Sequence, residues 1–182
     1  GRVCLEDEAV RVLFISGASA VGEAYRVKHS AFDKLFFAGP GCMPTAVVFE
    51  DADPQAASRF ITRRAFINGG QYCTTLKKAL IHRDLYQEVR ERILEFTGNL
   101  RVGDPFDPET DIGPIRVERT RLILERALDK CSWARKLAGA IEGERVFPLV
   151  LEMDGGEIPD LELFGPFLLL KPFDDHKPMV QE

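Results

Sequence analysis

Short apolar runs alternate along the chain with longer segments in which apolar residues recur every three or four positions. The runs are rich in the branched and aromatic residues that favour strands, and glycine, proline or aspartate separates them. We expect strands at residues 10–16, 34–37, 45–49, 78–82, 147–151 and 167–170, and a turn of small residues at 18–20. Because strands joined by crossover helices form parallel sheets, this order predicts an α/β fold with an open, largely parallel sheet and helices on both faces, a three-layer αβα arrangement.

Three segments have the spacing of amphipathic helices. The first opens at Asp53-Pro54, because aspartate suits the N-cap and proline the first helical position, and Gly69-Gly70 is expected to stop it. The second opens at Asp84 and ends at Gly98, and the third follows Gly113-Pro114. The positions expected to face the core are Ala56, Ala57, Phe60 and Ile61 in the first helix, Leu85, Val89, Ile93 and Phe96 in the second, and Val117, Leu124, Leu128 and Cys131 in the third.

The composition narrows the class of protein. Hydrophobic residues make up 45% and charged residues 29% of the 182 positions, which is typical of a globular chain and argues against disorder. The net charge of -5 offers no basic surface to nucleic acid or to an anionic membrane. No apolar run is long enough for a signal peptide or a membrane span. We therefore expect a cytoplasmic protein whose partners include neither nucleic acid nor a membrane.

The four cysteines are Cys4, Cys42, Cys73 and Cys131, and no two of them form a C-x-x-C pair. The histidines do not lie beside them at the spacing of zinc ligands, so we expect no metal site. So sparse a pattern suits reduced thiols better than disulfides. Cys131 continues an apolar helical stripe, and we expect it to be buried.

Cys73 lies in a different setting, directly after Gly69-Gly70 and before an expected strand. Paired glycines allow the backbone to approach a ligand closely and leave amide groups free to point at it. A thiol in such a loop, reachable by solvent and facing a cleft, suits nucleophilic chemistry. Local composition alone fits a buried structural cysteine better, because no histidine lies nearby in sequence to act as a base.

A set of short motifs changes this balance. They are Glu50-Asp51-Ala52-Asp53, Phe66-x-Asn68-x-Gly70-Gln71-x-Cys73-Thr74, Leu100-Arg101-Val102-Gly103-Asp104-Pro105, Asp111-Ile112-Gly113-Pro114-Ile115 and Glu162-Leu163-Phe164-Gly165-Pro166. Each resembles a motif of the aldehyde dehydrogenase superfamily. They occur in the order of that family and at about its spacing, from Ile15 to Phe173. The resemblance therefore covers almost the whole chain.

The resemblance implies a role for five residues. Cys73 resembles the thiolate that attacks an aldehyde carbonyl to form a thiohemiacetal, and its backbone N–H would supply half of the oxyanion hole. Hydride transfer to NAD or NADP then leaves a thioester on the enzyme. Glu162 matches the residue that holds the nicotinamide ribose, and Phe164 matches the aromatic residue beside the ring. Gly17 and Gly22 match a glycine-containing segment of the family that lies near the cofactor.

Two substitutions depart from the family pattern. The glutamate that activates the deacylating water falls on Ala38, which cannot accept a proton. The serine that contacts the pyrophosphate falls on Ala18. From the resemblance we also expect that this chain lacks most of the cofactor domain of the family and its oligomerisation arm. We interpret residues 1–33 as the residual end of a cofactor-binding domain and 34–182 as the catalytic domain, and we expect the isolated chain to be inactive.

Three functions remain open at this point. The first is a catalytic domain that oxidises a small-molecule aldehyde with NAD or NADP. The second is an acyl-transferring or reductive member of the superfamily, which needs no hydrolytic base at position 38. The third is a pseudoenzyme or interaction domain. For each, we expect a homo-oligomer, because the missing parts would cover apolar surface at Phe14, Ile15 or the run 167–170.

Overall fold

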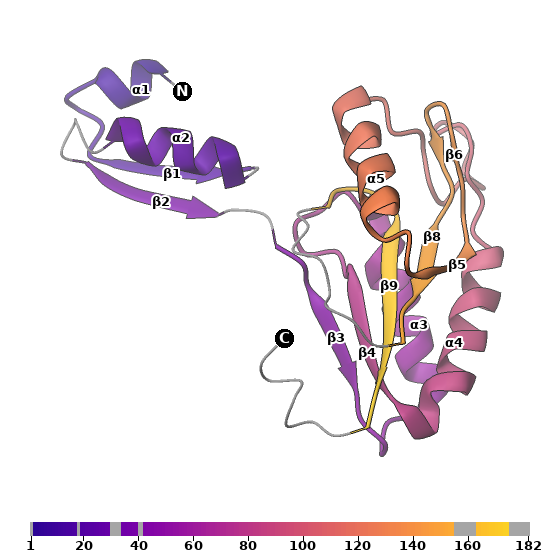
Figure 1. The fold of residues 1–182 in the computed structure, drawn as a ribbon. Coiled ribbons are helices and arrows are strands. Elements are labelled where there is room, and N and C mark those ends of the chain that lie inside the picture. Colours follow the sequence, from indigo (N-terminus) through magenta and orange to yellow (C-terminus); the bar gives the residue numbers. More distant parts are fainter. Residues whose placement is uncertain (1, 18, 30–33, 40–41, 155–162, 175–182) are drawn as a thin grey trace. The chain divides into compact units, whose positions relative to one another are not determined.

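A computed structural model describes residues 2–17, 19–29, 34–39, 42–154 and 163–174 of the chain (Figure 1). The chain forms two compact units, Gly1–Cys42 and Met43–Glu182. The sequence-based boundary lay earlier, between 33 and 34. The structural boundary lies later because the strand that begins at Leu35 pairs with a strand of the first unit.

The first unit contains α1 (Arg2–Glu6), β1 (Val12–Ser16), α2 (Ser19–His29) and β2 (Leu35–Gly39). β1 and β2 are parallel, with Val12 opposite Leu35. The turn expected at 18–20 is wrong, since α2 begins at Ser19. Small residues favour a turn locally, but two parallel neighbours need a crossover, and here a helix supplies it.

The second unit is built on a five-stranded sheet in the order β3-β4-β9-β8-β5. These strands are β3 (Thr45–Val48), β4 (Lys78–His82), β9 (Phe167–Phe173), β8 (Leu149–Glu152) and β5 (Arg135–Ala138). All pairs are parallel except β5 with β8. The prediction of an open, largely parallel sheet is confirmed. The sequence did not predict β5, nor the small hairpin of β6 (Ile141–Glu142) and β7 (Arg145–Val146).

Helices cover both faces of this sheet (Figure 1). The helices are α3 (Pro54–Phe66), α4 (Arg83–Gly98) and α5 (Glu118–Lys130). Alternate residues of β9 separate two apolar clusters: Leu168 and Leu170 share one with α3 and α4, whereas Phe167 and Leu169 share the other with α5. The three-layer αβα prediction is therefore confirmed. None of the described helices is both long and apolar enough to cross a membrane.

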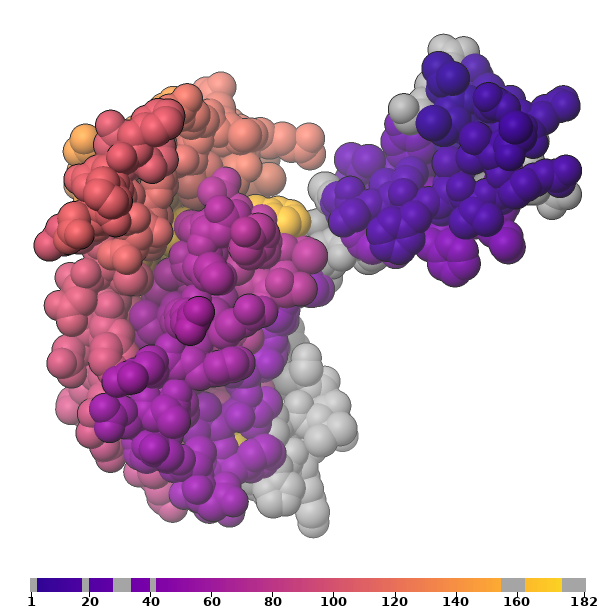
Figure 2. All heavy atoms as spheres, turned by 180° about the vertical axis from the view of Figure 1, so that it is seen from behind, coloured from indigo at the N-terminus to yellow at the C-terminus, as the bar shows by residue number. Residues whose placement is uncertain are grey.

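The expected face of α3 is partly wrong. Ile61 is buried as expected, but Phe60 is 58% exposed and Ala56 is exposed. The buried face instead carries Ser58, Ile61, Thr62, Ala65 and Phe66. α3 lies directly against α4 (Figure 2), and the Ser58 hydroxyl donates to Pro54 O and lies 3.3 Å from Val89 O of α4. Small side chains allow this close approach, which an apolar-face argument does not anticipate.

The other two helices follow their expected faces more closely. In α4, Val89 and Ile93 are fully buried. In α5, Leu124 is fully buried and Cys131, which caps its C-terminus, is 1% exposed. Val117 is 59% exposed, because it is the N-cap of α5 and lies outside the helical stripe.

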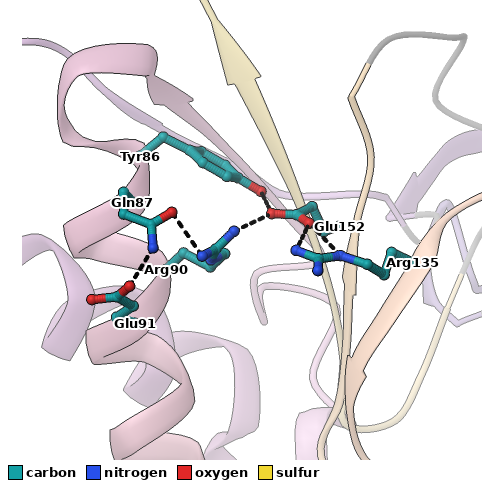
Figure 3. A network of polar contacts seen from close by, with 6 residues as sticks. All are labelled: Tyr86, Gln87, Arg90, Glu91, Arg135 and Glu152. Atoms are coloured by element: carbon teal, nitrogen blue, oxygen red, sulfur yellow. Dashed lines mark hydrogen bonds and ion pairs between the residues drawn. The ribbon is translucent and has the colours of Figure 1, made fainter.

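A polar network ties α4 to the edge of the sheet (Figure 3). Glu152 of β8 accepts hydrogen bonds from the Tyr86 hydroxyl at 2.8 Å, from Arg90 at 3.0 Å and from Arg135 Nε at 2.7 Å. Burial pushes the pKa of the Glu152 carboxyl upward, but the hydrogen bonds from Arg90, Tyr86 and Arg135 outweigh it, so that its pKa lies below its usual range. The carboxylate is therefore held in its charged form.

Candidate functional site

The loop that carries Cys73 begins with an unusual backbone turn. After α3 ends at Phe66, a 3-10 segment, η1 (Ile67–Gly70), contains three successive residues with left-handed conformation. Their φ angles are 52° at Asn68, 60° at Gly69 and 68° at Gly70. Such a run is unfavourable for L-residues, and asparagine and glycine are the residues that tolerate it best. At Gly70 a Cβ would lie 2.1 Å from Gly165 O, so only glycine fits.

This turn is fastened to the segment around Gly165. The Gly165 N–H donates to Gly70 O at 2.9 Å. Lys77 Nζ donates to both carbonyl oxygens, at 2.7 Å to Gly70 O and 2.6 Å to Gly165 O. The Thr75 hydroxyl lies 3.0 Å from Gly70 O and 2.7 Å from Tyr72 O. Several donors thus converge on one carbonyl three residues before Cys73.

Lys77 is the residue of this site that the sequence argument missed. Its side chain is fully buried, and burial lowers the pKa of its ammonium group to about 7. A signal was present, because a lysine directly before a strand buried on both faces is unexpected. That signal does not identify the partner groups, which lie on a distant segment.

The Cys73 side chain is exposed, so the expected solvent accessibility is confirmed. Tyr72 beside it is 51% exposed. Cys131 is the opposite case, because it is buried and burial raises the pKa of its thiol. Only the first of these two cysteines is available to a substrate in solution.

The segment that carries Phe164 lies beside the loop that carries Cys73. Phe164 is half-buried and directly precedes Gly165, whose N–H binds Gly70 O. Leu163 beside it is 2% exposed and anchors the segment in the core. Glu162 lies outside the described residues.

Gly17 and Gly22 lie in the first unit. Gly17 follows β1, and a Cβ there would meet nothing within 4 Å. The first turn of α2, which comes next, holds no acidic residue. The expected place of Gly17 and Gly22 beside a cofactor stays a prediction. Gly22 is buried in α2, where a Cβ would lie 3.4 Å from that of Ala38, and Ala38 itself is exposed on β2.

A hollow of about 370 Å³ opens on the second unit. The residues that line it are Arg59, Thr62, Arg63, Phe66, Ile67, Asn68, Phe96, Leu100, Asp111 and Ile112. It includes two residues of the η1 turn, but Cys73 is not part of its lining. The cleft expected in front of Cys73 therefore stays a prediction. Among the described residues, no three His, Cys, Asp or Glu side chains gather to hold a metal ion.

Comparison with known proteins covers the whole chain. The model of the aldehyde dehydrogenase family matches residues 1–182. The 3-sulfolactaldehyde dehydrogenase of Priestia aryabhattai is 28% identical over 180 residues, which are 96% of this chain and 37% of that protein. The chain thus spans little more than a third of the length of this curated relative.

Solved structures show the same similarity. The NAD-dependent aldehyde dehydrogenase from Sinorhizobium meliloti has a TM-score of 0.88 at 26% identity, over 99% of this chain and 38% of that one. The Mycobacterium tuberculosis aldehyde dehydrogenase complexed with NAD+ has a TM-score of 0.86 at 26% identity, over 97% of this chain and 39% of that one.

Proposed function

The chain belongs to the aldehyde dehydrogenase family, and from that premise we propose that it carries the nucleophile of an NAD(P)-dependent aldehyde dehydrogenase. The observation that carries the proposal is the exposed Cys73 thiol beside a left-handed turn that is bonded to the Phe164–Gly165 segment. A structural cysteine would need neither exposure nor a backbone turn of this kind.

In the proposed reaction, the Cys73 thiolate attacks the carbonyl carbon of a small-molecule aldehyde. The Cys73 N–H donates to the oxygen on which negative charge develops, and a thioester on Cys73 results. NAD(P), when bound, supplies the hydride acceptor. We assign Gly17 and Gly22 to its pyrophosphate end, and the open space beside Gly17, where a Cβ would meet nothing within 4 Å, supports the assignment. Phe164 and Glu162 are assigned to its nicotinamide end.

The proposed function also implies a division of the chain into two domains. We propose that the residual end of a cofactor-binding domain, expected from the sequence at residues 1–33, extends to Cys42 with β2, and that the catalytic domain, expected at 34–182, begins at Met43. The 182-residue chain alone is not competent for turnover, because little of a dinucleotide surface is encoded in it. The natural protein acts in the cytoplasm as a homo-oligomer.

Ala38 favours a second candidate function, transfer of the acyl group to an acceptor other than water. Alanine at this position removes the proton acceptor that the family uses for hydrolysis. The thioester on Cys73 would then persist until another thiol attacks it. A reductive enzyme that runs from an acyl donor to an aldehyde has the same requirement.

The test is a pre-steady-state measurement of NAD(P)H formation in the full natural protein. We expect a burst stoichiometric with Cys73, followed by a slow steady state, because loss of a general base typically costs about a hundred- to ten-thousandfold in rate. Ala38→Glu should raise the steady rate and preserve the burst. Coenzyme A should raise the steady rate if the enzyme transfers acyl groups.

Cys73→Ser should abolish the burst, whereas Cys4→Ser, at another exposed cysteine, should not change it. If neither a burst nor an acyl adduct on Cys73 is detected by mass spectrometry, the proposal fails. The pseudoenzyme interpretation is then the better one.

A further inference from the structure

We propose that Lys77 is the positioning residue of the nucleophile, acting through the carbonyl oxygens of Gly70 and Gly165 to set where Cys73 lies relative to the Phe164 segment. The inference rests on the proposed function of Cys73. Lys77 itself, fully buried, touches no substrate, so its action is indirect.

The backbone of Lys77 is held firmly by hydrogen bonds to neighbouring segments of the sheet. Its backbone N–H donates to Pro44 O at 3.0 Å, and its carbonyl accepts from Leu169 N at 2.9 Å. The residue is therefore rooted in the sheet at the start of β4. From there its ammonium reaches Gly70 O at 2.7 Å and Gly165 O at 2.6 Å. One side chain thus joins the rigid sheet to both motif-bearing segments.

The turn at Asn68–Gly70 needs contacts of this kind to keep its backbone conformation. Three successive left-handed residues are not a stable structure by themselves, and strained backbone persists only where its surroundings determine it fully. Glycine has more alternative conformations than any other residue, so the turn can relax easily when its contacts are lost. A relaxed turn would move Cys73, because only Gln71 and Tyr72 separate it from Gly70.

Core stability alone does not account for Lys77. Burial of the ammonium is unfavourable, as its pKa of about 7 indicates, and an apolar side chain of similar length fills such a space at lower cost. Without the lysine, Gly70 O would keep the Gly165 N–H and the Thr75 hydroxyl as donors, and Gly165 O would keep the Phe167 N–H. The charge of Lys77 therefore contributes more to the positions of the two segments than to the free energy of folding.

The experiment compares Lys77→Met with the unchanged full natural protein. We expect the rate constant of the NAD(P)H burst to fall roughly ten- to a hundredfold, since small misplacements of reacting groups have effects of that size. The burst amplitude per folded molecule and the KM for the aldehyde should change much less. Hydrogen exchange of the peptide that spans residues 69–75 should become faster, while exchange in α4 stays unchanged.

Two control variants sharpen the comparison. Lys136→Met removes an exposed lysine charge of β5 and should leave the burst and the exchange unchanged. Thr75→Val removes a hydroxyl from Gly70 O but keeps the lysine, so its burst rate should stay well above that of Lys77→Met. If Lys77→Met does not fold, Lys77→Gln, which lacks the charge and the full reach, takes its place with the same expected result.

The outcomes are distinguishable. A normal burst rate constant with reduced amplitude, together with unchanged exchange at 69–75, would show a merely structural lysine and overturn the inference. Absence of a burst in the unchanged protein would instead overturn the proposed function, and this inference with it.

Discussion

At the scale of single residues, two charged groups of the second unit have lowered pKa values for different reasons. Burial removes the Lys77 ammonium from water, and the two carbonyls that it binds carry no negative charge to offset this, so the pKa of the ammonium falls. The Glu152 carboxylate meets two guanidinium groups and a hydroxyl, so its pKa falls for the opposite reason, stabilisation of the charged form. Glu152 therefore contributes to the stability of the fold at every pH at which its carboxyl is ionised.

We expect Glu152→Gln to lower the free energy of unfolding by about 1.5–3 kcal/mol at pH 7, the usual range for hydrogen bonds to charged groups. The folded pKa lies below the usual value of 4.5, so the contribution is complete above that value and is lost as the pH falls through the folded pKa. The difference between the two proteins should therefore shrink in acid. Urea titrations from pH 7 to 3 measure it.

A matched control is Glu88→Gln. Glu88 pairs with Arg92 on α4 at 2.8 Å, and the two side chains are 52% and 36% exposed. Exposed pairs of this kind contribute about 0.3–0.5 kcal/mol. An equal effect of the two substitutions would contradict the importance given to the Glu152 network.

At the scale of elements, α3 shows how a local signal starts a helix. The Asp53 side chain accepts from Gln55 N at 2.8 Å and Ala56 N at 3.3 Å, and Pro54 occupies the first helical position. The helix then ends at Phe66, just before the left-handed turn. Both ends follow from residues within a few positions, which is why the sequence predicts them.

Asp53→Ala should lower the free energy of unfolding by about 1 kcal/mol, because two N–H groups of the first turn lose their acceptor. Denaturant unfolding followed by circular dichroism measures the change. Asp51→Ala, at an exposed carboxylate that does not cap the helix, should change stability by less than about 0.5 kcal/mol. If Asp51→Ala lowered the free energy of unfolding as much as Asp53→Ala, the effect would arise from the loss of negative charge and not from the loss of the helix cap.

At the scale of the whole molecule, the first unit leaves one side of its two-stranded sheet open to solvent. Four side chains that pair across β1 and β2 are exposed: Val12 at 52%, Leu35 at 64%, Phe14 at 73% and Phe37 at 54%. Phe14 was expected on such a surface. The run 167–170 was also expected there, and that prediction is wrong, because β9 lies inside the sheet and both of its faces are covered.

We predict that the 182-residue chain self-associates through this face, since contiguous apolar surface drives association. Replacing Phe14 and Phe37 together by serine should weaken association by at least roughly tenfold, given about 1.5–3 kcal/mol for each buried side chain. Sedimentation velocity over a range of concentrations measures it. Phe106→Ser removes an isolated phenylalanine, 90% exposed, and should have no effect. A monomer at every concentration contradicts the prediction.

The sequence by itself determined the helices α3, α4 and α5, the strands β3, β4, β8 and β9, the start of α3 at Asp53 and the loop position of Cys73. These features depend on the period of apolar residues and on capping and turn residues that are neighbours along the chain. The resemblance to the aldehyde dehydrogenases arises from motifs of the same short range.

Only the tertiary structure decided the antiparallel edge strand β5, the exposure of Phe60 and the link from Lys77 to Gly70 and Gly165. Lys77 and Gly165 are 88 residues apart, and no local pattern shows that they meet. Strand order, the close approach of two helices and the partner of a buried charge all arise from packing between distant segments. Because such contacts are chosen by the free energy of the whole fold, short-range periodicity cannot determine them.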